Sequence, residues 1–179
     1  MWLALALLGL AAPSALADQT DARLPELFDR LAEAPGQGEA AAVEARIWLI
    51  WLESGRDDVD SLVESGIGAM SAGRLDEAIE AFDRAVELAP RFAEGFNKRA
   101  TAYFLASRLA ESVNDIQRTL ALEPRHFGAL SGMGLIFLRQ GDERGALAAF
   151  EAVLEIYPAS ASARANVERL RRKIGTKRV

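Results

Sequence analysis

The chain has 179 residues, 50% apolar and 26% charged, and its 34 Ala and 24 Leu against 8 Val, 8 Ile and 4 Thr favour helices, so we expect an all-α fold. It contains no Cys and one His, which excludes a disulfide framework, a thiolate zinc site, a cysteine nucleophile and a multi-histidine metal cage; we expect no metal and no cofactor. The net charge of −5 divides into +6 over residues 164–179 and −11 over the rest, and an acidic body is poorly suited to nucleic acid phosphates.

Residues 1–17 have the pattern of a secretory signal. The stretch from Trp2 to Ala17 carries no charge, contains a leucine-rich apolar run, and ends in Ala-Leu-Ala directly before the polar Asp18. No Lys or Arg precedes the apolar run, so an uncleaved anchor or a misassigned start codon are the alternatives. Because Pro13 interrupts a segment already shorter than the ~20 residues of a spanning helix, we predict export with cleavage after Ala17.

Residues 18–58 are predicted to form a helical hairpin. Apolar residues at helical spacing predict helices at about 24–33 and 39–54, and Pro35-Gly36 ends the first of them.

Residues 59–160 contain an internal repeat of 34 residues. Pro90, Pro124 and Pro158 stand 34 residues apart, and each follows a helical stretch. This period predicts three stacked helical hairpins, at 59–92, 93–126 and 127–160. Bulky residues recur at one position of each unit, and small residues recur where the two helices of a hairpin cross closely. The bulky residues of that set are Phe82, Ile116 and Phe150.

Residues 161–179 are predicted to form a capping helix and a basic tail. Ser160 or Ser162 is the expected N-cap, the helix runs to about Lys173, and Val167, Leu170 and Ile174 form its apolar face. Such a helix would cover the last hairpin with one face and meet water with the other. The cations of the tail suit a helix C-terminus, so we do not expect membrane contact.

The repeats resemble the tetratricopeptide repeat (TPR) family, and in particular exported bacterial TPR proteins. The first unit matches the family pattern best, and the second departs from it at Arg99 and Ser112; the residues of the first unit that carry the match are Gly66, Ala78, Phe82, Ala85 and Pro90. The resemblance implies a right-handed superhelix of three clear repeats. Extending the frame upstream places Phe28, Leu31, Ala32 and Trp48 at repeat positions, so the hairpin at 18–58 is either a degenerate repeat or an N-terminal cap.

The resemblance also implies where a partner binds. TPR arrays bind peptide segments on a concave surface lined by the first helix of each repeat. We expect Asn97, Thr101 and Ser131 to bond a peptide backbone and the apolar residues to accept apolar side chains, unless they pack against the next hairpin. The predicted partner-binding residues are Val63, Ile67, Met70, Asn97, Thr101, Phe104, Ser131, Leu135, Leu138 and Arg139.

The carboxylate clamp of some chaperone-binding TPR domains is absent from the first repeat. That clamp requires Lys and Asn at positions occupied here by Val63 and Ile67. A partner read through its C-terminal carboxylate is therefore not expected, and an apolar or amphipathic segment is favoured.

Two polar residues need partners of their own. Arg99 stands where the family has an aliphatic residue, so we expect it to pair with Asp115 or Glu111, with ligand binding as the alternative. His126, after Pro124, is expected to be a solvent-exposed capping imidazole.

These features predict a non-enzymatic scaffold of the bacterial periplasm that binds a protein or peptide segment. The sequence contains no P-loop, dinucleotide-binding or zinc-protease motif. The alternative is a structural module that forms a homodimer through Trp48 and Trp51 of the N-terminal hairpin, with an incidental groove.

Overall fold

A computed structural model describes residues 18–176, and within them it contains nine helices and no strand. The predicted signal peptide falls on residues 1–17, outside the described residues. None of the described helices is long and apolar enough to span a membrane. The helices are α1 (Leu24–Glu33), α2 (Gln37–Trp51), α3 (Asp57–Ser71), α4 (Leu75–Leu88), α5 (Ala93–Leu105), α6 (Leu109–Leu122), α7 (Phe127–Gln140), α8 (Glu143–Ile156) and α9 (Ala161–Thr176).

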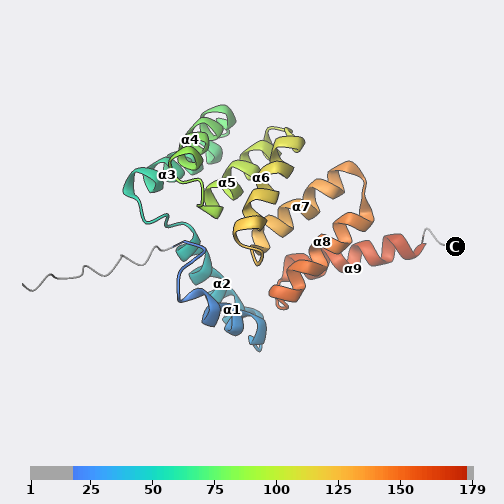
Figure 1. Cartoon of the computed structure of the whole chain (residues 1–179). Coiled ribbons are helices and arrows are strands. Elements are labelled where there is room, and N and C mark those ends of the chain that lie inside the picture. Colours follow the sequence, from blue (N-terminus) through green and yellow to red (C-terminus); the bar gives the residue numbers. More distant parts are fainter. Residues whose placement is uncertain (1–17, 177–179) are drawn as a thin grey trace, which may run out of the picture.

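The helices pack as consecutive hairpins, which confirms the all-α repeat fold (Figure 1). Helix α3 pairs with α4, α5 with α6, and α7 with α8, and each hairpin contacts the next through α4 with α5 and α6 with α7. A Cβ added to Gly66 would lie 2.5 Å from the ring of Phe82, and one added to Gly134 would lie 2.8 Å from the ring of Phe150. The small residues therefore allow the close crossing that the repeat pattern predicts.

In each of the three repeats, one residue of the turn between the two helices adopts a left-handed backbone, and these residues also stand 34 apart. Gly73 has φ +74° and Gly141 has φ +79°, as expected for the residue without a Cβ. Ser107 occupies the equivalent turn of the second hairpin with φ +63°. This turn is strained, because a side chain in that conformation costs about 1–2 kcal/mol.

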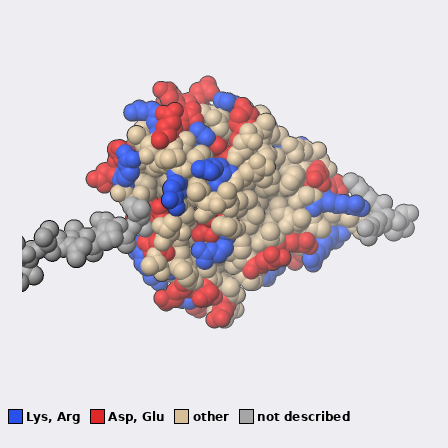
Figure 2. All heavy atoms as spheres, in the orientation of Figure 1, with Lys and Arg blue, Asp and Glu red and all other residues tan. Residues whose placement is uncertain are grey.

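Charged side chains are unevenly spread over the face seen in Figure 2. Lys, Arg, Asp and Glu gather at the left and along the upper and lower margins, whereas uncharged surface extends over the region of α6 and α7. This face therefore offers an extended area without charge.

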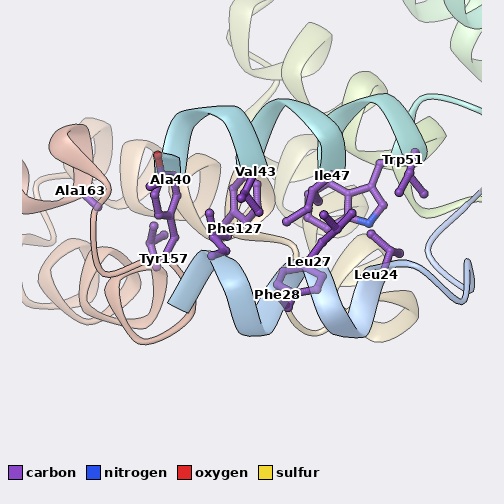
Figure 3. Packing of buried hydrophobic residues seen from close by; sticks show 13 residues of the cluster. Leu24, Leu27, Phe28, Ala40, Val43, Ile47, Trp51, Phe127, Tyr157 and Ala163 are labelled. Carbon is purple, nitrogen blue, oxygen red and sulfur yellow. The ribbon is translucent and has the colours of Figure 1, made fainter. Parts of the chain in front are cut away.

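The N-terminal hairpin does not stack on the first repeat. Helix α1 packs against α2 and α8, and neither α1 nor α2 packs extensively against α3 (Figure 1). Its buried side chains meet Phe127, Val153, Tyr157 and Ala163, which belong to the third repeat and to α9 (Figure 3). The hairpin is thus neither a fourth repeat in the stack nor a cap on its N-terminal end. Its own residues in this cluster are Leu24, Leu27, Phe28, Leu31, Ala40, Val43, Ile47, Ile50 and Trp51.

Helix α9 covers the last hairpin as predicted. The Ser160 hydroxyl accepts from the backbone N–H of Ala163 at 3.4 Å, so Ser160 rather than Ser162 caps the helix. Val167 and Leu170 are buried against α8, whereas Ile174 is only partly buried. Of the three residues predicted for the apolar face, Val167 and Leu170 therefore contribute most to the packing of α9.

Candidate functional site

A pocket of about 170 Å³ lies between α5 and α7, with α6 behind it. Its walls combine apolar side chains with an amide and three hydroxyls, and none of the lining residues is charged. The lining residues are Asn97, Ala100, Thr101, Phe104, Ser112, Ile116, Gly128, Ser131, Gly132 and Leu135.

The structure brings half of the predicted partner-binding residues together in this pocket. They are Asn97, Thr101, Phe104, Ser131 and Leu135. Leu135 is 44% exposed, which leaves this apolar side chain of the pocket open to contact with a partner.

The other predicted residues lie outside the pocket. Val63 is buried in the cluster between α3 and α4, and Ile67 and Met70 pack against that cluster. Leu138 packs against the cluster of α8 and α9. For Val63 the expectation of an open binding position is wrong, because its side chain is 2% exposed and already fills the core of the first repeat.

Arg139 marks the far end of the same face. Its guanidinium donates to the backbone carbonyl of Phe104 at 3.1 Å and to the hydroxyl of Ser107 at 2.8 Å, and lies 5.4 Å from the centre of the Phe104 ring. A cation at this point suits the C-terminus of α5. Arg139 therefore ties α7 to the turn that follows α5.

The three hydroxyls of the pocket all donate to helix carbonyls. Thr101 donates to Asn97 at 3.0 Å, Ser131 to Phe127 at 2.8 Å, and Ser112 to Ala100 at 2.7 Å. A hydroxyl has one hydrogen and two acceptor lone pairs. Toward the pocket, these groups can therefore act only as acceptors.

A buried carboxylate orients the amide of Asn97. Asn97 Nδ2 donates to Glu94 Oε2 at 2.9 Å, and the same oxygen accepts from His126 Nε2 at 2.9 Å. Lys98 Nζ lies 2.9 Å from Glu94 Oε1. Burial by itself raises the pKa of Glu94, but the hydrogen bond from His126 and the charge of Lys98 outweigh it, so the pKa lies below its ordinary value.

His126 is buried rather than solvent-exposed, so that expectation is wrong. Its side chain is fully enclosed, and its ring stacks on Trp51 with centroids 4.1 Å apart. It does cap a helix: Nδ1 accepts from the backbone N–H of Ala129 at 3.1 Å at the start of α7. Because Nδ1 accepts, the ring proton must sit on Nε2, where it is donated to Glu94.

Trp48 joins the N-terminal hairpin to the edge of the pocket. A Cβ added to Gly128 would lie 2.6 Å from Trp48 Cη2, so the indole takes the space of a side chain there. Lys98 Nζ lies 5.3 Å from the centre of the same indole. The two tryptophans on which the homodimer alternative depends are thus engaged within the chain, with Trp51 1% exposed.

Arg99 forms the structural pair expected of it. Its Nε and Nη2 donate to the two carboxylate oxygens of Asp115, each at 2.7 Å, and its Nη1 donates to Asp83 at 2.7 Å. Asp115 is buried, and its hydrogen bonds raise the pKa of the guanidinium. Both Asp115 oxygens bind Arg99, which therefore links α5 to α6 rather than facing a ligand.

Sequence reasoning missed part of the pocket wall and the network behind it. The pocket is also lined by residues that were not among the predicted binding residues, although the repeat frame places Gly128 on the groove-lining face of α7; they are Ala100, Ser112, Ile116, Gly128 and Gly132. The Glu94–His126 contact joins residues 32 positions apart, and no local sequence pattern predicts it.

The chain is similar in sequence to known repeat proteins. The family model described as tetratricopeptide repeat matches residues 63–118 and 97–161, together more than half of the chain. A TPR repeat-containing protein of Rhizobium etli is 36% identical over 156 residues, which are 87% of this chain and 76% of that protein. The cytochrome c-type biogenesis protein CycH of Rhizobium meliloti is 35% identical over 95 residues, which are 51% of this chain and 25% of that protein.

Solved structures share the architecture. The Sgt2 TPR domain from Aspergillus fumigatus matches with a TM-score of 0.64 and 25% identity, over 69% of this chain and 83% of that one. The first TPR of Spaghetti (RPAP3), solved with an HSP90 peptide bound, matches with a TM-score of 0.63 and 24% identity, over 66% of this chain and 94% of that one.

Proposed function

We propose that this chain, which belongs to the tetratricopeptide repeat family, is a non-enzymatic scaffold that binds an apolar or amphipathic segment of a partner protein in the pocket between α5 and α7. The observation that carries the proposal is an uncharged pocket whose rim includes Leu135, 44% exposed. Related folds support a peptide as the kind of ligand, since the RPAP3 domain was solved with an HSP90 peptide.

The expected affinity is modest. Burial of apolar surface contributes about 25 cal/mol per Å², and a pocket for one side chain leaves little after the costs of ordering a segment. Micromolar, transient binding therefore fits this site better than a permanent complex.

The test compares two leucines of nearly equal exposure, 44% for Leu135 and 42% for Leu88. Leu135→Glu places a charge at the pocket, and Leu88→Glu places the same charge on α4, where Leu88 is 42% exposed. Partners captured by the wild-type chain from cell-envelope extract should be lost with Leu135→Glu and retained with Leu88→Glu. A captured protein must then bind the purified chain directly by calorimetry; equal capture by both variants would contradict the proposal.

We also propose that this binding takes place in the periplasm. The support is the uncharged apolar run and the Ala-Leu-Ala sequence before Asp18. Intact-mass measurement of the protein isolated from its native cells should give a chain that begins at Asp18. A cytosolic chain that retains residues 1–17 would contradict the proposal.

A further inference from the structure

We propose that the pocket between α5 and α7 recognises a tryptophan side chain of the partner segment. The inference rests on the proposed function and specifies the group that enters the site. Three features carry it: the absence of charge from the walls, the direction of their hydrogen bonds, and the size of the space.

Charged groups are unsuited to this pocket. None of its lining side chains carries a charge, so an entering carboxylate or ammonium would lose water without gaining an ion pair. Charges beside the pocket are already engaged: Lys98 pairs with Glu94 at 2.9 Å, and Arg139 donates to the Phe104 carbonyl and the Ser107 hydroxyl. The C-terminal carboxylate of a peptide is therefore excluded.

The polar side chains that line the pocket offer more free hydrogen-bond acceptors than free donors. Thr101, Ser112 and Ser131 have each committed their single hydrogen to a helix carbonyl. Asn97 has committed one of its two amide hydrogens to Glu94, and no described residue donates to its Oδ1. Among the lining side chains, the second amide hydrogen of Asn97 is thus the only free donor, against several acceptors.

The matching ligand group is apolar and carries a donor without an acceptor. Indole meets this description because its N–H donates and it has no acceptor atom to leave unpaired, whereas a phenol or an amide also brings an acceptor that only the second amide hydrogen of Asn97 could satisfy. Phe104, Ile116 and Leu135 supply the apolar contacts for the ring. The space of about 170 Å³ is small by the standard of drug-sized ligand sites and suits a single side chain.

Free aromatic probes test the donor requirement on the full chain. Three probes are titrated into ¹⁵N-labelled protein. They are indole, 1-methylindole and benzoate; 1-methylindole has no N–H, and benzoate is an anion. We expect indole to shift the amide signals of Asn97, Ser131 and Leu135 and to bind about fivefold to tenfold more tightly than 1-methylindole, the effect of one hydrogen bond. Benzoate should bind more weakly than indole.

A variant and its matched control identify the acceptor side chains that bind the indole N–H. Asn97→Leu combined with Ser131→Ala removes two of the four acceptor side chains and should reduce the preference for indole over 1-methylindole, while Asn114→Leu on the exposed side of α6 should keep it. If the double variant does not fold, the wild-type comparison of probes stands alone.

The outcomes separate this inference from the proposed function. Equal binding of indole and 1-methylindole, stronger binding of benzoate, or no binding of indole at these residues would overturn the tryptophan assignment. Loss of captured partner with Leu135→Glu would still support segment binding in each of those cases. Equal capture by Leu135→Glu and Leu88→Glu would instead overturn segment binding itself.

Discussion

The indole of Trp51 lies flat on the imidazole of His126, with ring centroids 4.1 Å apart and planes inclined by 10°. His126 in turn donates to Glu94, and Glu94 accepts from Asn97 in the wall of the pocket. The packing of the N-terminal hairpin and the orientation of a pocket amide therefore depend on one continuous set of contacts.

The buried carboxylate of Glu94 should make the fold sensitive to acid. Because its pKa is lower in the folded chain than in the unfolded one, its contribution to the free energy of unfolding is present above its ordinary pKa and is lost as pH falls through the lowered value. Glu94→Gln should cost about 1.5–3 kcal/mol at pH 7. It should also flatten the loss of stability below about pH 4.5.

Urea unfolding at a series of pH values between 7 and 3 measures this effect. Glu80→Gln, at an exposed position of α4, is the control and should leave the wild-type pH dependence in place. A Glu94→Gln profile that runs parallel to that of the wild type would show that Glu94 does not couple folding to protons.

Gly128→Ala should loosen the N-terminal hairpin. The added Cβ would meet Trp48 Cη2 at 2.6 Å, and crowding of this kind typically costs about 1–3 kcal/mol. Gly68→Ala is the control, because nothing lies within 4 Å of its added Cβ and alanine inside a helix gains about 0.5–1 kcal/mol over glycine. Hydrogen exchange should speed up over residues 24–51 in the first variant only; unchanged exchange there would contradict this packing.

Ser107→Gly should stabilise the protein. Ser107 holds φ +63° at a turn where the equivalent positions of the neighbouring hairpins are glycine, so the substitution relieves strain of about 1 kcal/mol. The lost hydroxyl bond to Arg139 is exposed and offsets this only in part. Thermal unfolding should show a raised Tm, whereas Ser61→Gly inside α3 should lower it; a drop with both variants would argue against strain at Ser107.

Removal of Arg99 should be costly because it leaves a buried carboxylate. Arg99→Met deprives Asp115 of both its guanidinium bonds and should cost about 3–5 kcal/mol, most of which Asp115→Leu in the same chain should restore. Arg74→Met breaks the exposed pair with Glu77 and should change stability by less than about 1 kcal/mol. These values come from urea unfolding, and failure of the double variant to recover would point to a different role for Arg99.

Local sequence patterns were sufficient for the repeat itself. The prolines, the small residues at helix crossings and the apolar spacing each act within one hairpin or between adjacent ones, so their spacing along the chain reports their contacts. Half of the predicted binding positions line one pocket, because the face that α5 and α7 share follows from the helical period; their role in binding stays a prediction. Val63 was wrong since the period alone does not say which neighbour covers a side chain.

The position of residues 18–51 was decided by tertiary structure. The sequence indicates an apolar hairpin, through Phe28, Trp48 and Trp51. The residues that bury this hairpin, Phe127 and Tyr157, stand more than 70 residues away in the chain. The same holds for His126, whose sequence setting at a corner indicates exposure. Contacts at such a distance depend on how the stack curves in space, and no periodicity records that curvature.

The amino-acid sequence by itself therefore determined the helices, their 34-residue period and the face that lines a groove, because these follow from short-range spacing and side-chain size. Only the tertiary structure decided that the hairpin folds back onto the third repeat, that Glu94 is held between His126 and Lys98, and that the pocket presents acceptors. Those features arise where segments remote in sequence pack against one another and exclude water. Only the arrangement of these segments in space determines which polar groups are left without a hydrogen-bond partner.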